Sequence, residues 1–391
     1  MYKESNNMNV LIAIDSFKGS LTSMQAGQAA AVGIKRVYPD AEIMVRPIAD
    51  GGEGTVHALV DGMGGEMQVI RVTGPLGQAV DAEYGIIKSS QTAIIEMSAA
   101  AGITLVSAEE RNPLHTTTYG VGEIILDAIR KGCRNFIVGI GGSATNDGGF
   151  GMLKALGFGF FDEKGEPVPL GGKGLGELCK ITDEHALPEL KECTFNIACD
   201  VTNPLCGPRG CSAVFGPQKG ANPQMVAKMD KWLLNYAELV KRIRPDADKD
   251  APGAGAAGGI GFAFLSFLNG KLKNGIDLIL RETRLEQYVQ KADIVITGEG
   301  RLDAQTTMGK APSGIAAIAK KYGKPVIGFA GCVTEDAGAC NSCGIDAFFP
   351  VLRSVCTLEE AMNTDNAFAN MAATAEQVFR IIHTMKRNNS L

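Results

Sequence analysis

Turns that follow short apolar runs, most of them rich in glycine, constrain the fold of this chain more than any other feature. Glycine accounts for 49 of the 391 residues, well above the roughly 7% of average usage. Four such turns stand between an apolar run and a segment with helical spacing, at 15–20, 50–55, 139–149 and 297–303. Because backbone without side chains can approach a bound molecule closely, we expect ligand-binding turns between strands and helices.

Apolar runs alternate with helix-like segments, which indicates an α/β fold with largely parallel sheets. Asn9–Ile14 is continuously apolar, as expected of a strand buried on both faces. The length exceeds one compact core, so we expect two domains. The other expected strands are Ile43–Ile48, Met67–Val72, Ala93–Glu96, Phe136–Ile140, Phe195–Cys199, Ile294–Thr297, Val326–Ala330 and Ala347–Leu352, and the expected helices are Ser23–Val37, Thr55–Met63, Gly120–Lys131, Gly151–Leu156, Pro223–Ile243, Pro312–Lys321 and Glu359–Lys386.

Charge and apolar patterning limit the partners and the compartment. The net charge of −5 gives no electrostatic footprint for duplex nucleic acid. The longest apolar stretch, Ala254–Leu268, is interrupted by glycines and too short to span a membrane, and no signal-peptide pattern is present. The ten cysteines are expected to be reduced. Cys340 and Cys343 form a lone C-x-x-C, for which two thiols in a surface turn are favoured over half a zinc site or a redox pair. The sequence therefore predicts a cytoplasmic protein that binds neither nucleic acid nor membrane.

Three expected strands end in an aspartate: Asp15, Asp50 and Asp200. In open α/β sheets, ligands bind beyond the carboxyl ends of the strands. An anionic cluster there suits Mg²⁺, which prefers carboxylate, water and phosphate oxygens. One of these carboxylates could also accept a proton from a substrate hydroxyl, although each aspartate alone could equally be a helix cap or a turn former.

The turns around these carboxylates suit anions. Asp15–Ser20 presents amides, hydroxyls and Lys18 at the start of a helix, which favours a phosphate or carboxylate. Asp50–Thr55 has three glycines. Thr297–Asp303 contributes two carboxylates and Arg301, and is followed by a lysine. Arginine is suited to bidentate recognition of carboxylate or phosphate, and lysine to a phosphate point charge.

The densest cluster, Gly139–Gly149, predicts a nest for nucleotide phosphates. It partly matches a dinucleotide fingerprint, which keeps an NAD-dependent oxidoreductase open, but the acidic strand end expected about twenty residues later is missing. A purely structural glycine turn is the other interpretation. The similarly glycine-rich stretch Pro252–Gly261 is expected to be a tight ligand-binding or hinge loop rather than a spacer.

The four histidines have no partner in a recognisable nucleophile motif and no zinc spacing. This argues against acyl transfer and against structural zinc. The pattern favours phosphate, Mg²⁺ and carboxylate chemistry. A non-catalytic solute-binding protein remains an alternative to an enzyme at this point.

Taken together, nine segments resemble the bacterial glycerate kinase family, and they occur in order from Asp15 to Asp303. They are Asp15–Leu21, Ala49–Thr55, Thr73–Gly77, Arg111–Gly120, Gly139–Gly149, Cys199–Gly207, Phe215–Ala221, Pro252–Gly259 and Thr297–Asp303. The resemblance implies ATP-dependent phosphorylation of D-glycerate with Mg²⁺, giving 2-phosphoglycerate, with 3-phosphoglycerate as the alternative product.

The resemblance also implies an architecture that periodicity does not show. Residues 1–73 and 286–391 would form a flavodoxin-like domain with a parallel sheet. An inserted second α/β domain, at 74–285, would have a restriction-endonuclease-like topology. A homodimer is compatible with this expectation.

The hypothesis for the site assigns residues to four roles. The proton acceptor is Asp15 or Asp200, and cations neutralise the phosphoryl group or the glycerate carboxylate. The catalytic set is Asp15, Lys18, Asp200 and Arg301; the nucleotide set is Gly141, Gly142, Ser143, Thr145 and Asn146, acting through backbone amides; the glycerate set is Ser16, Asp50, Gly51, Gly52 and Glu53; and the Mg²⁺ ligands are Asp200 with Glu299 or Asp303.

Overall fold

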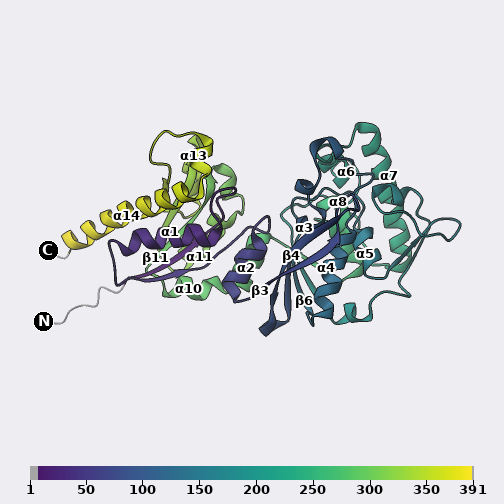
Figure 1. The fold of residues 1–391 in the computed structure, drawn as a ribbon, viewed down its shortest axis with the longest axis horizontal. Coiled ribbons are helices and arrows are strands. Elements are labelled where there is room, and N and C mark those ends of the chain that lie inside the picture. Colours follow the sequence, from purple (N-terminus) through teal and green to yellow (C-terminus); the bar gives the residue numbers. More distant parts are fainter. Residues whose placement is uncertain (1–7, 390–391) are drawn as a thin grey trace. The chain divides into compact units, whose positions relative to one another are not determined.

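The computed structural model describes residues 8–389, which divide into two compact units (Figure 1). The first unit contains the described residues up to Asp50, Asp61–Met63 and the residues from Ile276 onward. The second contains Gly51–Val60 and Gly64–Gly275. Each unit is described by itself below.

A five-stranded parallel sheet forms the centre of the first unit. Its strands are β1 (Asn9–Ile14), β2 (Glu42–Val45), β11 (Ile294–Leu302), β12 (Val326–Val333) and β13 (Ala347–Pro350), in the order β13-β12-β11-β1-β2. Counted within this unit alone, that is the 2-1-3-4-5 order of flavodoxin-like sheets. The point at which the strand order reverses therefore lies between β1 and β11.

Helices cover both faces of this sheet. Because neighbouring residues of each strand point to opposite faces, each strand contributes side chains to two separate cores. In β1, Ile12 packs in a core with α1 (Ser23–Lys35) and α14 (Thr364–Asn389). Its neighbour Leu11 packs in a second core with α10 (Leu285–Lys291) and α11 (Ala311–Lys321). The remaining helices of this unit are α9 (Gly275–Glu282), which begins at the unit boundary, α12 (Ala339–Ser342) and α13 (Leu358–Met362).

The second unit is built on a six-stranded mixed sheet in the order β10-β9-β6-β5-β4-β3. The pairs β3–β4 and β4–β5 are antiparallel, and the other three pairs are parallel. The strands are β3 (Glu66–Thr73), β4 (Ala79–Ile87), β5 (Thr92–Glu96), β6 (Asn135–Gly139), β9 (Thr194–Ala198) and β10 (Lys271–Lys273). Strands β7 (Gly159–Phe161) and β8 (Lys180–Thr182) form a separate antiparallel pair. The helices are α3 (Ser98–Ala101), α4 (Tyr119–Arg130), α5 (Phe150–Ala155), α6 (Cys211–Phe215), α7 (Pro223–Ile243) and α8 (Ala256–Phe267), while α2 (Thr55–Met63) contributes residues to both units.

The structure departs from the sequence expectations in several elements. Strand β3 pairs with β4 along its whole length, so it belongs to the second unit, and the boundary lies earlier than residue 73. The single helix expected at Glu359–Lys386 is two helices, because extended Asn363 separates α13 from α14. Strand β4 was not expected.

Apart from exposed Pro252 and half-buried Ala257, the glycine-rich stretch at 252–261 is buried in the second unit. Helix α8 begins within it and includes Ala257, Gly258 and Gly259 with left-handed backbone. A Cβ atom on Gly258 would collide with the carbonyl oxygen of Thr145, so this position accepts only glycine without rearrangement. The stretch is therefore a packing element rather than the predicted ligand-binding or hinge loop.

Two further findings concern composition. Among residues 8–389, no helix is both long and apolar enough to cross a membrane. All ten cysteines are free thiols, as predicted. However, Cys340 is buried in α12 and its thiol donates to the carbonyl oxygen of Asp303, so the expectation that it lies in a surface turn is wrong.

Candidate active site

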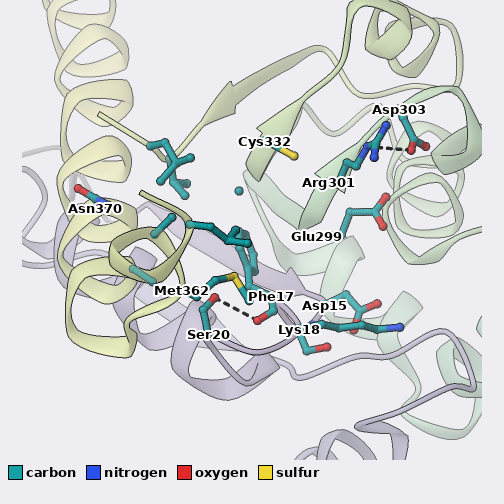
Figure 2. Close-up of a pocket in the computed structure, with 18 of the residues that line it drawn as sticks. Asp15, Phe17, Lys18, Ser20, Glu299, Arg301, Asp303, Cys332, Met362 and Asn370 are labelled. Atoms are coloured by element: carbon teal, nitrogen blue, oxygen red, sulfur yellow. Dashed lines mark hydrogen bonds and ion pairs between the residues drawn. The ribbon is translucent and has the colours of Figure 1, made fainter. Parts of the chain in front are cut away.

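A pocket of about 580 Å³ opens in the first unit at the carboxyl ends of β1 and β11, where the strand order reverses (Figure 2). Ligands bind at such switch points in doubly wound sheets. Seven predicted site residues line the pocket. They are Asp15, Ser16, Lys18, Asp50, Glu299, Arg301 and Asp303.

Asp15 follows β1 directly and is only 7% exposed. Ile14 is paired with Gly298 of β11, and the amide of Asp15 donates to the carbonyl oxygen of Gly298 at 2.9 Å. The amide of Ser16 donates to the Asp15 carboxylate at 2.6 Å. Burial, followed by repulsion from Asp50, raises the pKa of Asp15 to about 7 despite that hydrogen bond. The carboxyl group is therefore positioned to exchange a proton near neutral pH.

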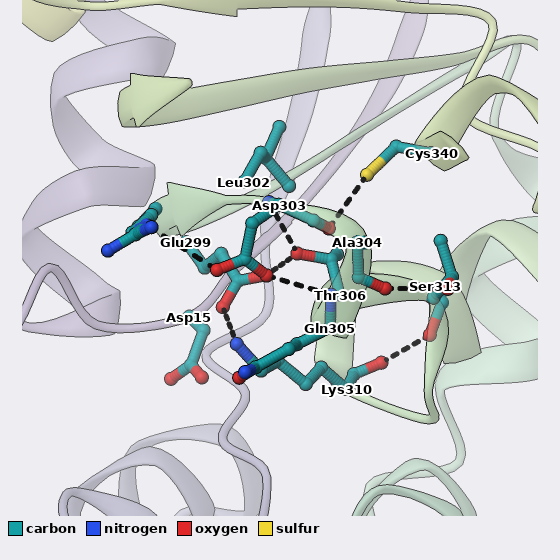
Figure 3. A network of polar contacts seen from close by, with 12 residues as sticks. Asp15, Glu299, Leu302, Asp303, Ala304, Gln305, Thr306, Lys310, Ser313 and Cys340 are labelled. Atoms are coloured by element: carbon teal, nitrogen blue, oxygen red, sulfur yellow. Dashed lines mark hydrogen bonds and ion pairs between the residues drawn. The ribbon is translucent and has the colours of Figure 1, made fainter. Parts of the chain in front are cut away.

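Glu299 lies on β11 and shares the pocket with Asp15 (Figure 3). The hydroxyl of Thr306 donates to its Oε1 at 2.7 Å, and the ammonium of Lys310 lies 3.5 Å from its Oε2. Burial raises the pKa of Glu299, while Thr306 and Lys310 oppose that increase. Two buried acidic groups from neighbouring strands thus face the same pocket.

Asp303 has a different environment from Glu299. Its Oδ1 accepts the amide of Gln305 at 2.9 Å, and with Thr306 it forms a capping box for the short 3₁₀ turn at Ala304–Thr307. Its Oδ2 lies 3.4 Å from Nε of Arg301. Because both carboxylate oxygens have protein partners, Asp303 acts in this structure as a helix cap and as the counter-ion of Arg301.

Three cations surround the carboxylates. Lys18 and Arg301 are exposed at the pocket, and Lys310 is partly buried beside Glu299. The side chain of Arg301 is 63% exposed, so solvent screens its ion pair with Asp303. These cations can neutralise a phosphate or a carboxylate that enters the pocket.

The five residues predicted to bind glycerate are divided between the two units. Ser16 and Asp50 line the pocket of the first unit, whereas Gly51, Gly52 and Glu53 belong to the second unit. Gly51 has a φ of +96° and packs against Ala198 at the end of β9. Within the first unit, the structure places the first two members of the set at one pocket.

In the glycine-rich turn Gly139–Gly149, which follows β6, fewer residues are exposed to solvent than the sequence suggests. Gly141 and Gly142 are exposed, and Gly142 has a φ of +72°. Ser143, Thr145 and Asn146 are at most 7% exposed. Only the two glycines present backbone to a ligand, so the side chains of the other three predicted nucleotide-binding residues belong to the interior.

A buried lysine holds that turn from inside. Lys219 is 2% exposed, and its ammonium donates to the Ser143 hydroxyl at 2.7 Å and to the Thr145 carbonyl at 2.6 Å. Burial lowers the pKa of Lys219 to about 8. Asp147, also fully buried, accepts the amide and hydroxyl of Thr118 at 2.8 and 2.9 Å. In the sequence, Lys219 stood out only as part of the Phe215–Ala221 segment, and Asp147 was assigned no role.

Asp200, which follows β9 in the second unit, is exposed. Its Oδ1 accepts the amide of Gly275 at 2.8 Å and the side-chain amide of Asn274 at 3.0 Å. In the part of the chain that the structure describes, no group of three or more histidine, cysteine, aspartate or glutamate side chains is arranged to hold a metal ion. A metal at this site would therefore depend on one or two carboxylates and on oxygens of the substrates.

The geometry defines a class of protein. A buried carboxyl group with a pKa near neutrality stands among cations at the switch point of a flavodoxin-like sheet. This arrangement can accept a hydroxyl proton while it neutralises a transferring anionic group, which is the requirement of a phosphotransferase.

Comparison with known proteins identifies the family. The model of the glycerate kinase family matches residues 10–383. The chain is 48% identical to glycerate 2-kinase of Escherichia coli K12, with 94% of this chain and 98% of that protein covered. It is 45% identical to glycerate kinase of Bacillus subtilis 168, with 97% and 99% covered.

A solved structure agrees with these relatives. The crystal structure of a protein from Salmonella typhimurium LT2, assigned as glycerate kinase 2, has a TM-score of 0.89 and 44% identity, over 97% of this chain and 99% of that chain. The chain belongs to the glycerate kinase family, and it is an enzyme that phosphorylates glycerate. The oxidoreductase and the non-catalytic binding protein are thereby set aside.

Proposed function

We propose that the enzyme uses ATP to phosphorylate D-glycerate at its 2-hydroxyl group, giving 2-phosphoglycerate. The name of the Escherichia coli relative, glycerate 2-kinase, supports this position because 48% identity extends over nearly both chains. Transfer to the 3-hydroxyl is the alternative.

The observation that carries the proposal is the buried carboxyl group of Asp15. Its pKa of about 7 suits a general base, since a base is most effective when its pKa lies near the working pH. Asp15 accepts the proton of the attacking hydroxyl. Lys18, Lys310 and Arg301, from the same pocket, then stabilise the charge on the transferring phosphoryl group.

The residues also fit Mg²⁺. Asp15 and Glu299 place two buried carboxyl groups in one pocket, and a hard divalent cation, which is well matched to carboxylate and phosphate oxygens, would favour their ionised forms. Glu299 is the ligand we propose in this pocket, whereas the oxygens of Asp303 already have partners. Asp200 belongs to the second unit and stays a predicted ligand. When bound, the ion would neutralise the phosphates and align them with the hydroxyl group.

The substrate-positioning roles follow from what each segment exposes. Ser16 and Asp50 line the Asp15 pocket, and we assign them to glycerate. Gly51, Gly52 and Glu53, which follow Asp50 in the chain, stay a prediction for the same role. The exposed backbone of Gly141 and Gly142 is assigned to phosphate. Ser143, Thr145 and Asn146 support that turn from within.

A product assay tests the proposal. Purified enzyme, ATP, Mg²⁺ and D-glycerate should yield an ester that phosphorus NMR identifies as 2-phosphoglycerate, and a 3-phosphoglycerate signal would overturn the positional assignment. The Asp15→Asn variant should lose at least about a hundredfold in kcat. Asp40→Asn, which changes an exposed aspartate outside the pocket, is the matched control and should retain activity.

We further propose that the enzyme is cytoplasmic and forms a homodimer. Cell fractionation would test the first statement. Light scattering on the purified enzyme would test the second.

A further inference from the structure

The Asp15 pocket has a second half that glycerate chemistry does not use. Opposite the charged groups, apolar side chains line the pocket, and we call this lining the apolar wall. It consists of Phe17, Val351, Leu352, Leu358, Met362 and Ala367. In Figure 2, Glu299, Arg301 and Asp303 lie on one side of the pocket and Met362 and Asn370 on the other.

Half of the residues of the apolar wall, Leu352, Leu358 and Met362, are exposed. Leu358 is 77% exposed and Met362 is 37% exposed, although both residues are large and apolar. Contiguous apolar surface beside a polar cluster marks a binding site more often than it marks a free surface. Glycerate is a three-carbon acid with an oxygen atom on every carbon, so it has no apolar face that could cover this wall.

The wall is attached to the turn that carries Asp15 and Lys18. The hydroxyl of Thr364, at the start of α14, donates to the Ser20 carbonyl at 2.9 Å. Gly19 lies against Met362, so closely that a Cβ atom there would stand 2.6 Å from the Met362 methyl carbon. A ligand bound on the wall therefore extends directly toward the catalytic cations.

Asn370 lines the same end of the pocket and is partly buried. Its side-chain amide has no hydrogen-bond partner among residues 8–389. An asparagine amide offers one acceptor and two donor hydrogens, which matches the mixed donor and acceptor edge of a purine base.

We propose that the apolar wall binds the purine base of the donor nucleoside triphosphate, with Asn370 hydrogen-bonded to the edge of the base. Such a ligand has a flat apolar end and a polyanionic end, as the two halves of the pocket require. The polarisable thioether of Met362 suits contact with an aromatic ring. This inference rests on the proposed kinase function, and it places the base in the first unit, on residues to which sequence reasoning gave no role.

The test uses a matched pair of variants on one segment. Leu358→Ser removes an apolar side chain from the wall, whereas Val355→Ser removes one that is fully exposed and does not line the pocket. Removing the apolar contact with Leu358 should raise the KM for ATP about tenfold, with little change in the KM for glycerate. Calorimetry should show the same loss of affinity for a non-hydrolysable ATP analogue, and Val355→Ser should resemble the wild type.

Asn370→Leu supplies a second readout, because it should reduce the preference for ATP over GTP in kcat/KM. An unchanged KM for ATP in Leu358→Ser, or a rise confined to the KM for glycerate, would overturn the inference and leave the kinase function standing. Weaker binding of the analogue in an enzyme that forms no phosphoglycerate would instead refute the proposed function and leave the base site standing.

Discussion

Replacing Asp15 by asparagine removes a carboxyl group whose ionisation the folded protein resists. Burial and the neighbouring carboxylates of Asp50 and Glu299 raise the pKa of Asp15 from 3.8 to about 7, while Lys18 and the Ser16 amide only partly oppose them. The unfolded chain ionises this group at its ordinary pKa. As the pH rises from about 4 to about 7, the unfolded state therefore loses its proton first, and the wild type becomes less stable.

The size of this effect on the free energy of unfolding follows from the pKa shift of Asp15. A difference of about three pKa units corresponds to about 4 kcal/mol, at about 1.4 kcal/mol per unit. Asparagine has no such ionisation, so the Asp15→Asn variant should gain stability over the wild type by about 1.4 kcal/mol per pH unit. The gain should reach a plateau of about 4 kcal/mol above pH 7.

Urea denaturation from about pH 5 to about pH 8 measures this difference, with a chelator present and no nucleotide. Asp40→Asn serves as the control, with no pH-dependent difference expected. A difference between Asp15→Asn and the wild type that stays constant with pH, or that falls as the pH rises, would refute the reasoning. The same variant should be nearly inactive at every pH, which would show stability exchanged for function at this residue.

Further predictions concern the same structure. The kcat/KM for glycerate should rise with pH through an apparent pKa near 7, because the ionised form of Asp15 is the base; an Asp200→Asn variant should keep this inflection, and its loss would identify Asp200 as the base instead. Asp303→Ser should preserve the cap and most activity, whereas Asp303→Ala should cost about 1 kcal/mol in urea denaturation; a hundredfold loss of kcat in the serine variant would instead identify Asp303 as a metal ligand. Gly258→Ala should destabilise the protein by at least about 3 kcal/mol, because the new Cβ collides with the Thr145 carbonyl, whereas Gly165→Ala, also at positive φ but with open space around it, should cost only about 1–2 kcal/mol. Removal of Mg²⁺ by a chelator should abolish turnover, and added Mg²⁺ should restore it; full activity in the chelator would exclude the proposed metal.

The local elements of this protein could be predicted from its sequence. Strand β1 and helices α2 and α7 have the predicted bounds. Apolar spacing and capping side chains act between residues near each other in the chain, so they are visible in the sequence. The motifs also indicated the family, which the comparisons confirm. Strand β4 was not predicted, because the alternating hydrophobic pattern of a strand in a mixed sheet is a weaker signal than the continuous apolar run of a buried parallel strand.

The tertiary structure decided which chemical groups meet. The pairing of β1 with β11 places Asp15 and Glu299 in one pocket although they are far apart in the sequence. Burial, and with it the raised pKa of Asp15, exists only once those strands are paired. Similarly, the interior of the glycine-rich turn depends on Lys219, and the apolar wall depends on α13 packing near Gly19. Side-chain burial and strand order arise from contacts between distant segments, which local spacing does not encode.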